Sequence, residues 1–196
     1  MLRKIGIATI VLAASSMPAF AHLNPEEHGS FAAGFSHPLF GTDHILAMVA
    51  VGLWAALLGG RAVWLVPTAF VGTMALGFAA SLLDLPLPFV EPVILASVVV
   101  IGLLAAVALR VPAWLGMTMV GFFAFFHGHA HGGEIGAATA LAYGAGFALA
   151  TALLHAAGVA TGSSLPRLIG GEAGRYATRV AGAATALGGL WLALGA

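Results

Sequence analysis

The sequence predicts an all-α membrane protein, a bundle of six transmembrane helices that follows a cleavable signal peptide. Of the 196 residues, 61% are hydrophobic and 7% are charged, whereas soluble domains carry about 25% charged residues. The mean hydropathy is +1.04, and the apolar residues fall into long runs. Equal numbers of basic and acidic residues, seven of each, give no indication of nucleic-acid binding. The lack of cysteine in the sequence excludes disulfides and thiolate metal sites.

Residues 1–21 have the organisation of a secretory signal peptide. Arg3 and Lys4 form a basic start, an apolar stretch follows, and the segment ends in Ala-Phe-Ala at Ala21. These are the basic region, the apolar region and the small-x-small cleavage site of such a signal. The apolar region is too short to cross a bilayer, which takes about 20 residues. We expect cleavage after Ala21, so that the mature chain begins at His22.

An exported tail, residues 22–36, leads into a six-helix transmembrane domain, residues 37–196. Each apolar run in this domain is long enough to cross about 30 Å of hydrocarbon at about 1.5 Å per residue. Glycine, proline or charged residues separate each run from the next. The predicted spans are 38–59, 62–83, 91–109, 112–131, 135–160 and 174–195.

The charged residues divide between the two sides of these spans. If the mature N-terminus is exported, the connections after the first, third and fifth spans lie in the cytoplasm. Six of the seven acids then fall outside, with Glu172 as the exception. Positive residues concentrate on the cytoplasmic side of membrane proteins, and we therefore expect a multi-pass protein of the bacterial inner membrane with a periplasmic N-terminus. The cytoplasmic connections hold every basic residue of the mature chain: Arg61, Arg110, Arg167, Arg175 and Arg179.

Histidines and acids form a first cluster at the outer end of the first span. Ionisable side chains inside a membrane are costly and indicate function. The segment HPLFGTDH holds His37, Asp43 and His44, with Met48 one turn deeper than His44. On a regular helix, the backbones of His37 and His44 would lie about 10 Å apart. The Pro and Gly of this segment predict an irregular entry instead, with the helix proper starting near Thr42 and His37 folded back over it.

A second cluster, FHGHAHGGE, lies at the outer end of the fourth span. His127 and His131 are four residues apart and share a helical face, which Glu134 continues. Two histidines at this spacing are a metal-chelating pattern on a helix. His129 points the other way if the segment stays helical. The glycines of the segment leave open which two of the three histidines converge.

Imidazole and carboxylate ligands without thiolate suit borderline divalent ions such as Ni²⁺, Co²⁺, Zn²⁺ or Cu²⁺. We expect the two clusters to capture such an ion at the exported face and to pass it inward between the first and fourth helices. His22, with the α-amino group that cleavage frees, is an accessory ligand candidate, and so are His129 and Met48. His155, near the cytoplasmic end of the fifth span, we interpret as a hydrogen-bonding packing residue. The inner half of the path otherwise offers few polar groups.

The segments HPLFGTDH and FHGHAHGGE resemble the two signature motifs of the HupE/UreJ family of nickel permeases. The resemblance covers the whole chain, with a signal peptide, an exported N-terminus and the motifs on the first and fourth of six spans. It implies a role in nickel supply to hydrogenase or urease. His129 stands at a variable position of the second motif, so the resemblance gives it no ligand role. The residues that it implicates in transport are His37, Asp43, His44, His127, His131 and Glu134.

Together these features predict a permease for a divalent transition-metal ion, first of all nickel, with cobalt or another divalent ion as the next choice. We expect the ion as cargo, no bound cofactor, and hydrogenase or urease maturation proteins as indirect partners. Two other classes stay open: an intramembrane zinc hydrolase with Asp43 or Glu134 as general base, and a metal receptor that transports nothing. The first and fourth spans run in opposite directions yet both carry a motif outside, as an inverted repeat of three plus three helices would produce.

Overall fold

The computed structural model describes residues 30–133, 135 and 139–195, and within these ranges the chain is all-helical. The predicted signal peptide, the tail up to residue 29 and Glu134 lie outside the described residues. The helices are α3 Ser30–Phe40, α4 Thr42–Leu58, α5 Ala62–Leu82, α6 Val90–Ala106, α7 Ala113–Gly133, α8 Ala140–Leu168 and α9 Gly171–Ala193.

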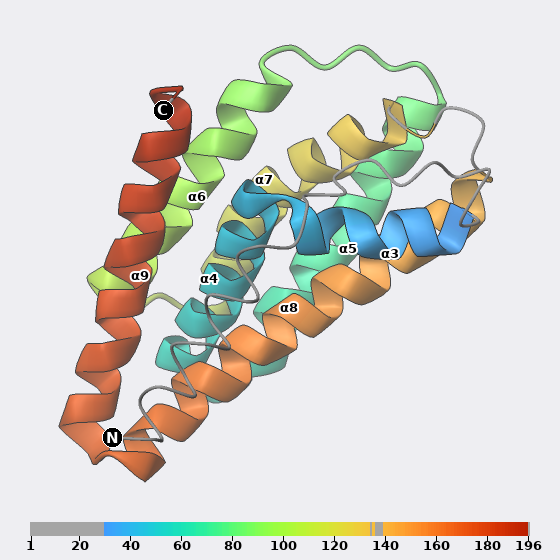
Figure 1. Cartoon of the computed structure of the whole chain (residues 1–196). Helices are drawn as coiled ribbons and strands as arrows, with labels where there is room; N and C mark the ends of the chain where they lie inside the picture. The colour runs from blue at the N-terminus through green and yellow to red at the C-terminus, as the bar shows by residue number, and fades with distance from the viewer. Residues whose placement is uncertain (1–29, 134, 136–138, 196) are drawn as a thin grey trace, which may run out of the picture.

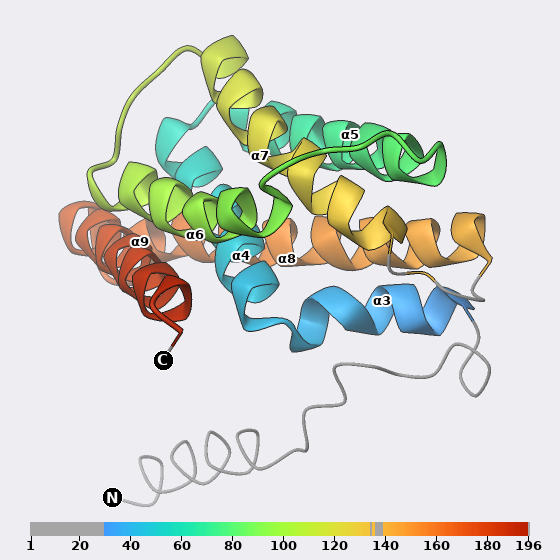
Figure 2. The same ribbon diagram turned by 90° about the horizontal axis from the view of Figure 1, so that it is seen from above.

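The helices pack in side-by-side pairs around α4. In Figures 1 and 2, α6 lies beside α9, α5 lies beside α7, and α3 runs along the first half of α8. Helix α4 contacts α3, α5, α6, α8 and α9, which makes it the central helix of the bundle. Residues that face the centre of the bundle therefore come mainly from α4 and from the inward sides of α5, α7 and α8.

The first predicted span, 38–59, covers the end of α3 and all of α4, and these two helices are bent by 78° at a break. Gly41 forms the break, with φ −79° and ψ 115°, and α4 begins at Thr42. This confirms the irregular entry predicted from the Pro and Gly of the first motif. Helix α3 already begins at Ser30, so the expected boundary between tail and domain falls inside a helix. The apolar and small residues of α3 pack along α8, and this packing accounts for the early start.

Not every predicted span is equally long and apolar. Helices α5 and α8 are each long and apolar enough to cross a membrane, and the bent α3–α4 pair is a third candidate. Helix α6 is apolar but has 17 residues. Helix α7 carries three histidines, and α9 begins with an acid and two arginines. The all-helical membrane class is thus confirmed, with two clear spans and several borderline ones.

Glycines let the paired helices touch backbone to backbone. A Cβ built on Gly128 of α7 would lie 1.8 Å from the carbonyl oxygen of Met74 on α5, and one on Gly77 of α5 would lie 2.0 Å from that of Phe125 on α7. Only a residue without a side chain fits at either position. Small residues serve this purpose in membrane bundles, where lipid gives helices no hydrophobic drive to associate.

Candidate metal site

Four histidines from three helices meet between α3, α4 and α7, and we call His37, His44, His127 and His131 the histidine cluster. One ring nitrogen from each of His37, His44 and His131 lies within 4.8 Å of the other two. The ring centroids of His37 and His44 lie 4.5 and 4.6 Å from that of His131, and the ring of His127 lies 5.4 Å from that of His44. The two motifs predicted from the sequence therefore converge in space.

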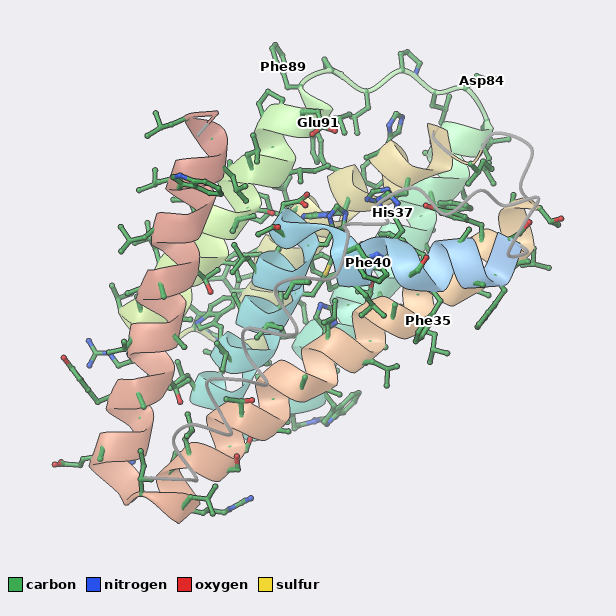
Figure 3. All side chains as sticks on the ribbon, in the orientation of Figure 1. Phe35, His37, Phe40, Asp84, Phe89 and Glu91 are labelled. Atoms are coloured by element: carbon green, nitrogen blue, oxygen red, sulfur yellow. The ribbon has the colours of Figure 1, made fainter. Side chains whose placement is uncertain are left out.

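Two local features of the backbone bring these rings together. The bend at Gly41 turns α3 away from the α4 axis, and it leaves His37 at the end of α3 next to the first turn of α4 (Figure 3). The ring centroids of His37 and His44 are 5.6 Å apart as a result. Helix α7 stays regular through its glycines, so His127 and His131 share one buried face, with exposures of 0% and 3%.

His44 links the other members of the cluster. Its Nε2 lies 2.5 Å from Nε2 of His131, and its Nδ1 lies 2.9 Å from Oδ2 of Asp43. Two nitrogens bound to one ion at about 2.0–2.1 Å each would lie about 3 Å apart. The two rings therefore need to part by only about half an ångström to share an ion. Asp43 contacts the ring nitrogen of His44 that faces away from His131. A carboxylate in this position orients a metal-binding imidazole.

Ser97 of α6 determines which nitrogen of His127 is free. The Ser97 hydroxyl donates a hydrogen bond to the carbonyl oxygen of Ile94 at 2.6 Å, and its oxygen lies 3.0 Å from Nε2 of His127. Because the hydroxyl proton is already used, Ser97 accepts the proton of Nε2. Nδ1 of His127 is then the basic nitrogen, and it is buried without a partner among the described residues. This lone pair is available for an ion.

Sequence reasoning missed Ser97. A signal was present, because Ser97 and Glu91 are the two residues with polar side chains in α6. A hydroxyl in an otherwise apolar span costs free energy unless it is paired. Its partner on α7 is 30 residues away, however, and no local pattern connects the two.

The remaining predicted residues lie apart from the cluster or outside the described ranges. His129 faces away, as expected for a regular helix, and its Nε2 lies 2.7 Å from the carbonyl oxygen of Leu85. Met48 is fully buried in the hydrophobic core. His22 and Glu134 lie outside the described residues.

Aromatic rings enclose the histidine cluster on its inward side. The ring of Phe147 on α8 lies 4.4 Å from that of His131, and the ring of Phe70 on α5 lies 5.7 Å from that of His127. Both phenylalanines are almost fully buried. These rings give His127 and His131 an apolar surrounding, in which polar interactions gain strength.

His155 does not have the hydrogen bonds that we expected of a packing histidine. It is 1% exposed, and neither ring nitrogen has a hydrogen-bond partner within the described part of the chain. The ring of Phe70 packs edge-on against it at 4.9 Å. Phe70 thus contacts both His155 and His127 of the cluster.

Apolar paired helices around converging imidazoles and a partly exposed carboxylate define a helical membrane protein with side chains suited to a divalent metal ion. The comparisons with known proteins agree with this class. The family model described as HupE / UreJ protein matches residues 10–192. The chain is 45% identical to Protein HupE of Rhizobium leguminosarum bv. viciae over 193 residues, which are 98% of this chain and 100% of that protein.

The chain therefore belongs to the HupE/UreJ family, as its two motifs indicated. This is a family of transporter-type accessory proteins. No solved structure matches the chain significantly.

Proposed function

We propose that this protein is an inner-membrane permease that moves a divalent transition-metal ion, with nickel as the first candidate, from the periplasm to the cytoplasm. The observation that carries the proposal is the convergence of both family motifs on one set of nitrogens, from the half-buried His37 and the buried His44 and His131. Imidazole nitrogens beside a single carboxylate favour Ni²⁺ or Co²⁺ over Mg²⁺ or Ca²⁺. The ion is cargo that feeds hydrogenase or urease maturation.

The membrane potential is sufficient to drive such a permease. A divalent cation that moves toward an inside-negative cytoplasm gains roughly 4.6 kcal/mol per 100 mV, from about 2.3 kcal/mol per unit charge. That free energy corresponds to an accumulation of more than a thousandfold at equilibrium. No nucleotide is needed in this mechanism.

The proposed topology has a cleaved signal peptide, a periplasmic N-terminus and six spans, with the α3–α4 pair as the first. Charge at the two ends of the bundle supports it. Asp84 and Glu91 lie at the α5–α6 connection, at the end of the bundle opposite the α8–α9 connection (Figure 3). The motif end of α7 lies beside the same connection, because Nε2 of His129 is 2.7 Å from the carbonyl oxygen of Leu85. At the other end, Arg110, Arg175 and Arg179 line one hollow of about 560 Å³.

An inverted repeat of three plus three helices is part of the same proposal. It accounts for two helices of opposite direction, α4 and α7, that both carry a motif at the periplasmic end. A structure with inward and outward states related by exchange of the two halves would support the repeat.

Uptake into proteoliposomes that contain only this protein tests the function. The vesicles carry an imposed inside-negative potential, and Ni²⁺, Co²⁺, Zn²⁺ and Mn²⁺ are compared one at a time. We expect accumulation of Ni²⁺ that collapses when the potential is removed, and that is lost in His37→Ala, His44→Ala and His131→Ala. His129→Ala is the matched control, because it removes an imidazole from the same helix but not from the cluster.

The same assay separates the two other classes. Ni²⁺ binding that depends on His44 and His131, without uptake under any potential, would identify a receptor or accessory subunit and refute the permease. Hydrolysis of a membrane peptide that requires Zn²⁺ and Asp43 would identify the zinc hydrolase. Uptake that survives all three alanine substitutions would show that the ion takes another route.

A further inference from the structure

His155 is the one histidine of the described residues that belongs neither to the histidine cluster nor to a surface. It lies on α8, fully enclosed, with two ring nitrogens that have no hydrogen-bond partner within the described ranges. Burial of an unpaired imidazole costs free energy that a leucine at the same place would not cost. Its presence there requires a reason other than packing.

Two helices place His155 at the same depth below the cluster. On α8, His155 follows Phe147 by eight residues, and Phe147 packs against His131. On α4, Gly52 follows His44 by eight residues, and a Cβ on Gly52 would lie 2.2 Å from the carbonyl oxygen of His155. At 1.5 Å per residue each count gives about 12 Å. Along the helix axes, His155 therefore lies about 12 Å from the level of His44 and His131, toward the end where α8 joins α9.

His127 and Phe70 bridge this gap. His127 lies one turn inward of His131 on α7, or about 6 Å along the helix. The ring of Phe70 stands between, 5.7 Å from that of His127 and 4.9 Å from that of His155. One turn before His155, the hydroxyl of Thr151 lies 3.8 Å from the sulfur of Met74, and both side chains are buried. The imidazole of His127, the Thr151 hydroxyl with the Met74 sulfur, and the imidazole of His155 thus offer possible ligand atoms at successive depths.

We propose that His155 is an inner metal-binding residue, which takes the ion from His127 on its way toward the cytoplasm. This inference rests on the proposed function, and it supplies the inner half of the path that the sequence left without ligands. A neutral imidazole keeps one nitrogen with a free lone pair, which is the form that binds a borderline divalent ion. A mostly apolar hollow of about 550 Å³ between α5 and α8 borders His155.

His155→Leu separates this role from packing. If His155 only fills space, the leucine variant keeps uptake, because leucine fills the same space without a polar atom. If His155 binds the ion in transit, uptake falls by about tenfold or more, the loss known for disturbed metal-ligand shells. Binding of Ni²⁺ at the histidine cluster and the melting temperature stay close to those of the unmodified protein. Wild-type uptake by this variant would overturn the proposal.

A cysteine at this position provides a direct probe of binding. The sequence has no cysteine, so the thiolate of His155→Cys would be the single thiolate present, and Co²⁺ bound to it absorbs in the near ultraviolet through sulfur-to-metal charge transfer. Ala157→Cys is the matched control, since Ala157 lies on the same turn of α8 but is exposed on the outside of the bundle. We expect the band on addition of Co²⁺ to the first variant and not to the second. A cobalt band in both variants, or in neither, would overturn the proposal.

The cobalt experiment also tests the role of His155 independently of the proposed permease function. If the unmodified protein takes up no metal but His155→Cys still shows the cobalt band, the permease is refuted and the inner binding residue stands. If uptake is normal and the band is missing, the permease stands and the role of His155 is refuted.

Discussion

Substitution of Gly128 by alanine tests whether close packing of α5 and α7 holds the histidine cluster in place. The new Cβ would lie 1.8 Å from the carbonyl oxygen of Met74, 2.7 Å from its carbon and 2.8 Å from the nitrogen of Phe78. All three are backbone atoms, so no side-chain rotation relieves the contact. A carbon and a carbonyl oxygen approach to about 3.3 Å. Helix α7 must therefore move away from α5 by about 1.5 Å.

The displacement has two measurable effects. Overpacking of a tight contact costs about 1–3 kcal/mol of folding free energy. Gly128 also lies between His127 and His131, which move with α7. Disturbance of the groups that orient metal ligands costs about 10–100-fold in metal affinity, and we expect a loss of Ni²⁺ affinity of that order. The shift would also change the distance between His127 and Ser97, which is 3.0 Å in the unmodified protein.

Thermal unfolding in detergent and equilibrium binding of Ni²⁺ measure the two effects separately. Gly72→Ala is the matched control, because a Cβ at Gly72 on α5 meets nothing within 4 Å. An alanine there should stabilise the helix by about 0.5–1 kcal/mol and leave binding unchanged. Because the two substitutions are expected to change stability in opposite directions, a general effect of replacing glycine by alanine would not explain both results. Equal stability and Ni²⁺ affinity for Gly128→Ala and the unmodified protein would refute the packing argument.

Three further predictions concern the site and the N-terminus. Asp43→Asn leaves His44 without its carboxylate partner and should weaken Ni²⁺ binding by about 10–100-fold, as titration calorimetry would measure; unchanged affinity would mean that Asp43 does not orient the ring. Ser97→Ala leaves the Nε2 proton of His127 unpaired and should cost about 1–3 kcal/mol of stability, whereas an unchanged melting temperature would argue against that hydrogen bond. Mass spectrometry of the protein from membranes should find a mature chain that begins at His22, and an intact Met1 would disprove cleavage.

Those features of the site that depend on spacing along one helix could be predicted from the sequence. The four-residue spacing of His127 and His131 placed both on one face, and α7 shows that face buried. The Pro and Gly of the first motif indicated the break before Thr42, where α4 begins. Both are local properties of the chain, set by helical geometry and by the backbone preferences of proline and glycine.

The features that depend on which helices meet could not be predicted in the same way. Ser97 faces His127, and Phe70 lies between His127 and His155, because α5, α6 and α7 pack in a particular arrangement. Membrane helices all present similar apolar surfaces, so composition does not select their neighbours. The unpaired state of His155 is likewise visible only once every neighbour is in place.

The glycine contacts give an ion in the site a structural role. Helices α5 and α7 touch backbone to backbone at Gly128, and α4 and α8 do so at Gly52. His44 belongs to the α4–α8 pair and His131 to the α5–α7 pair. An ion held by both rings would therefore bridge the two pairs, so that binding of the ion and the spacing between the pairs would depend on each other.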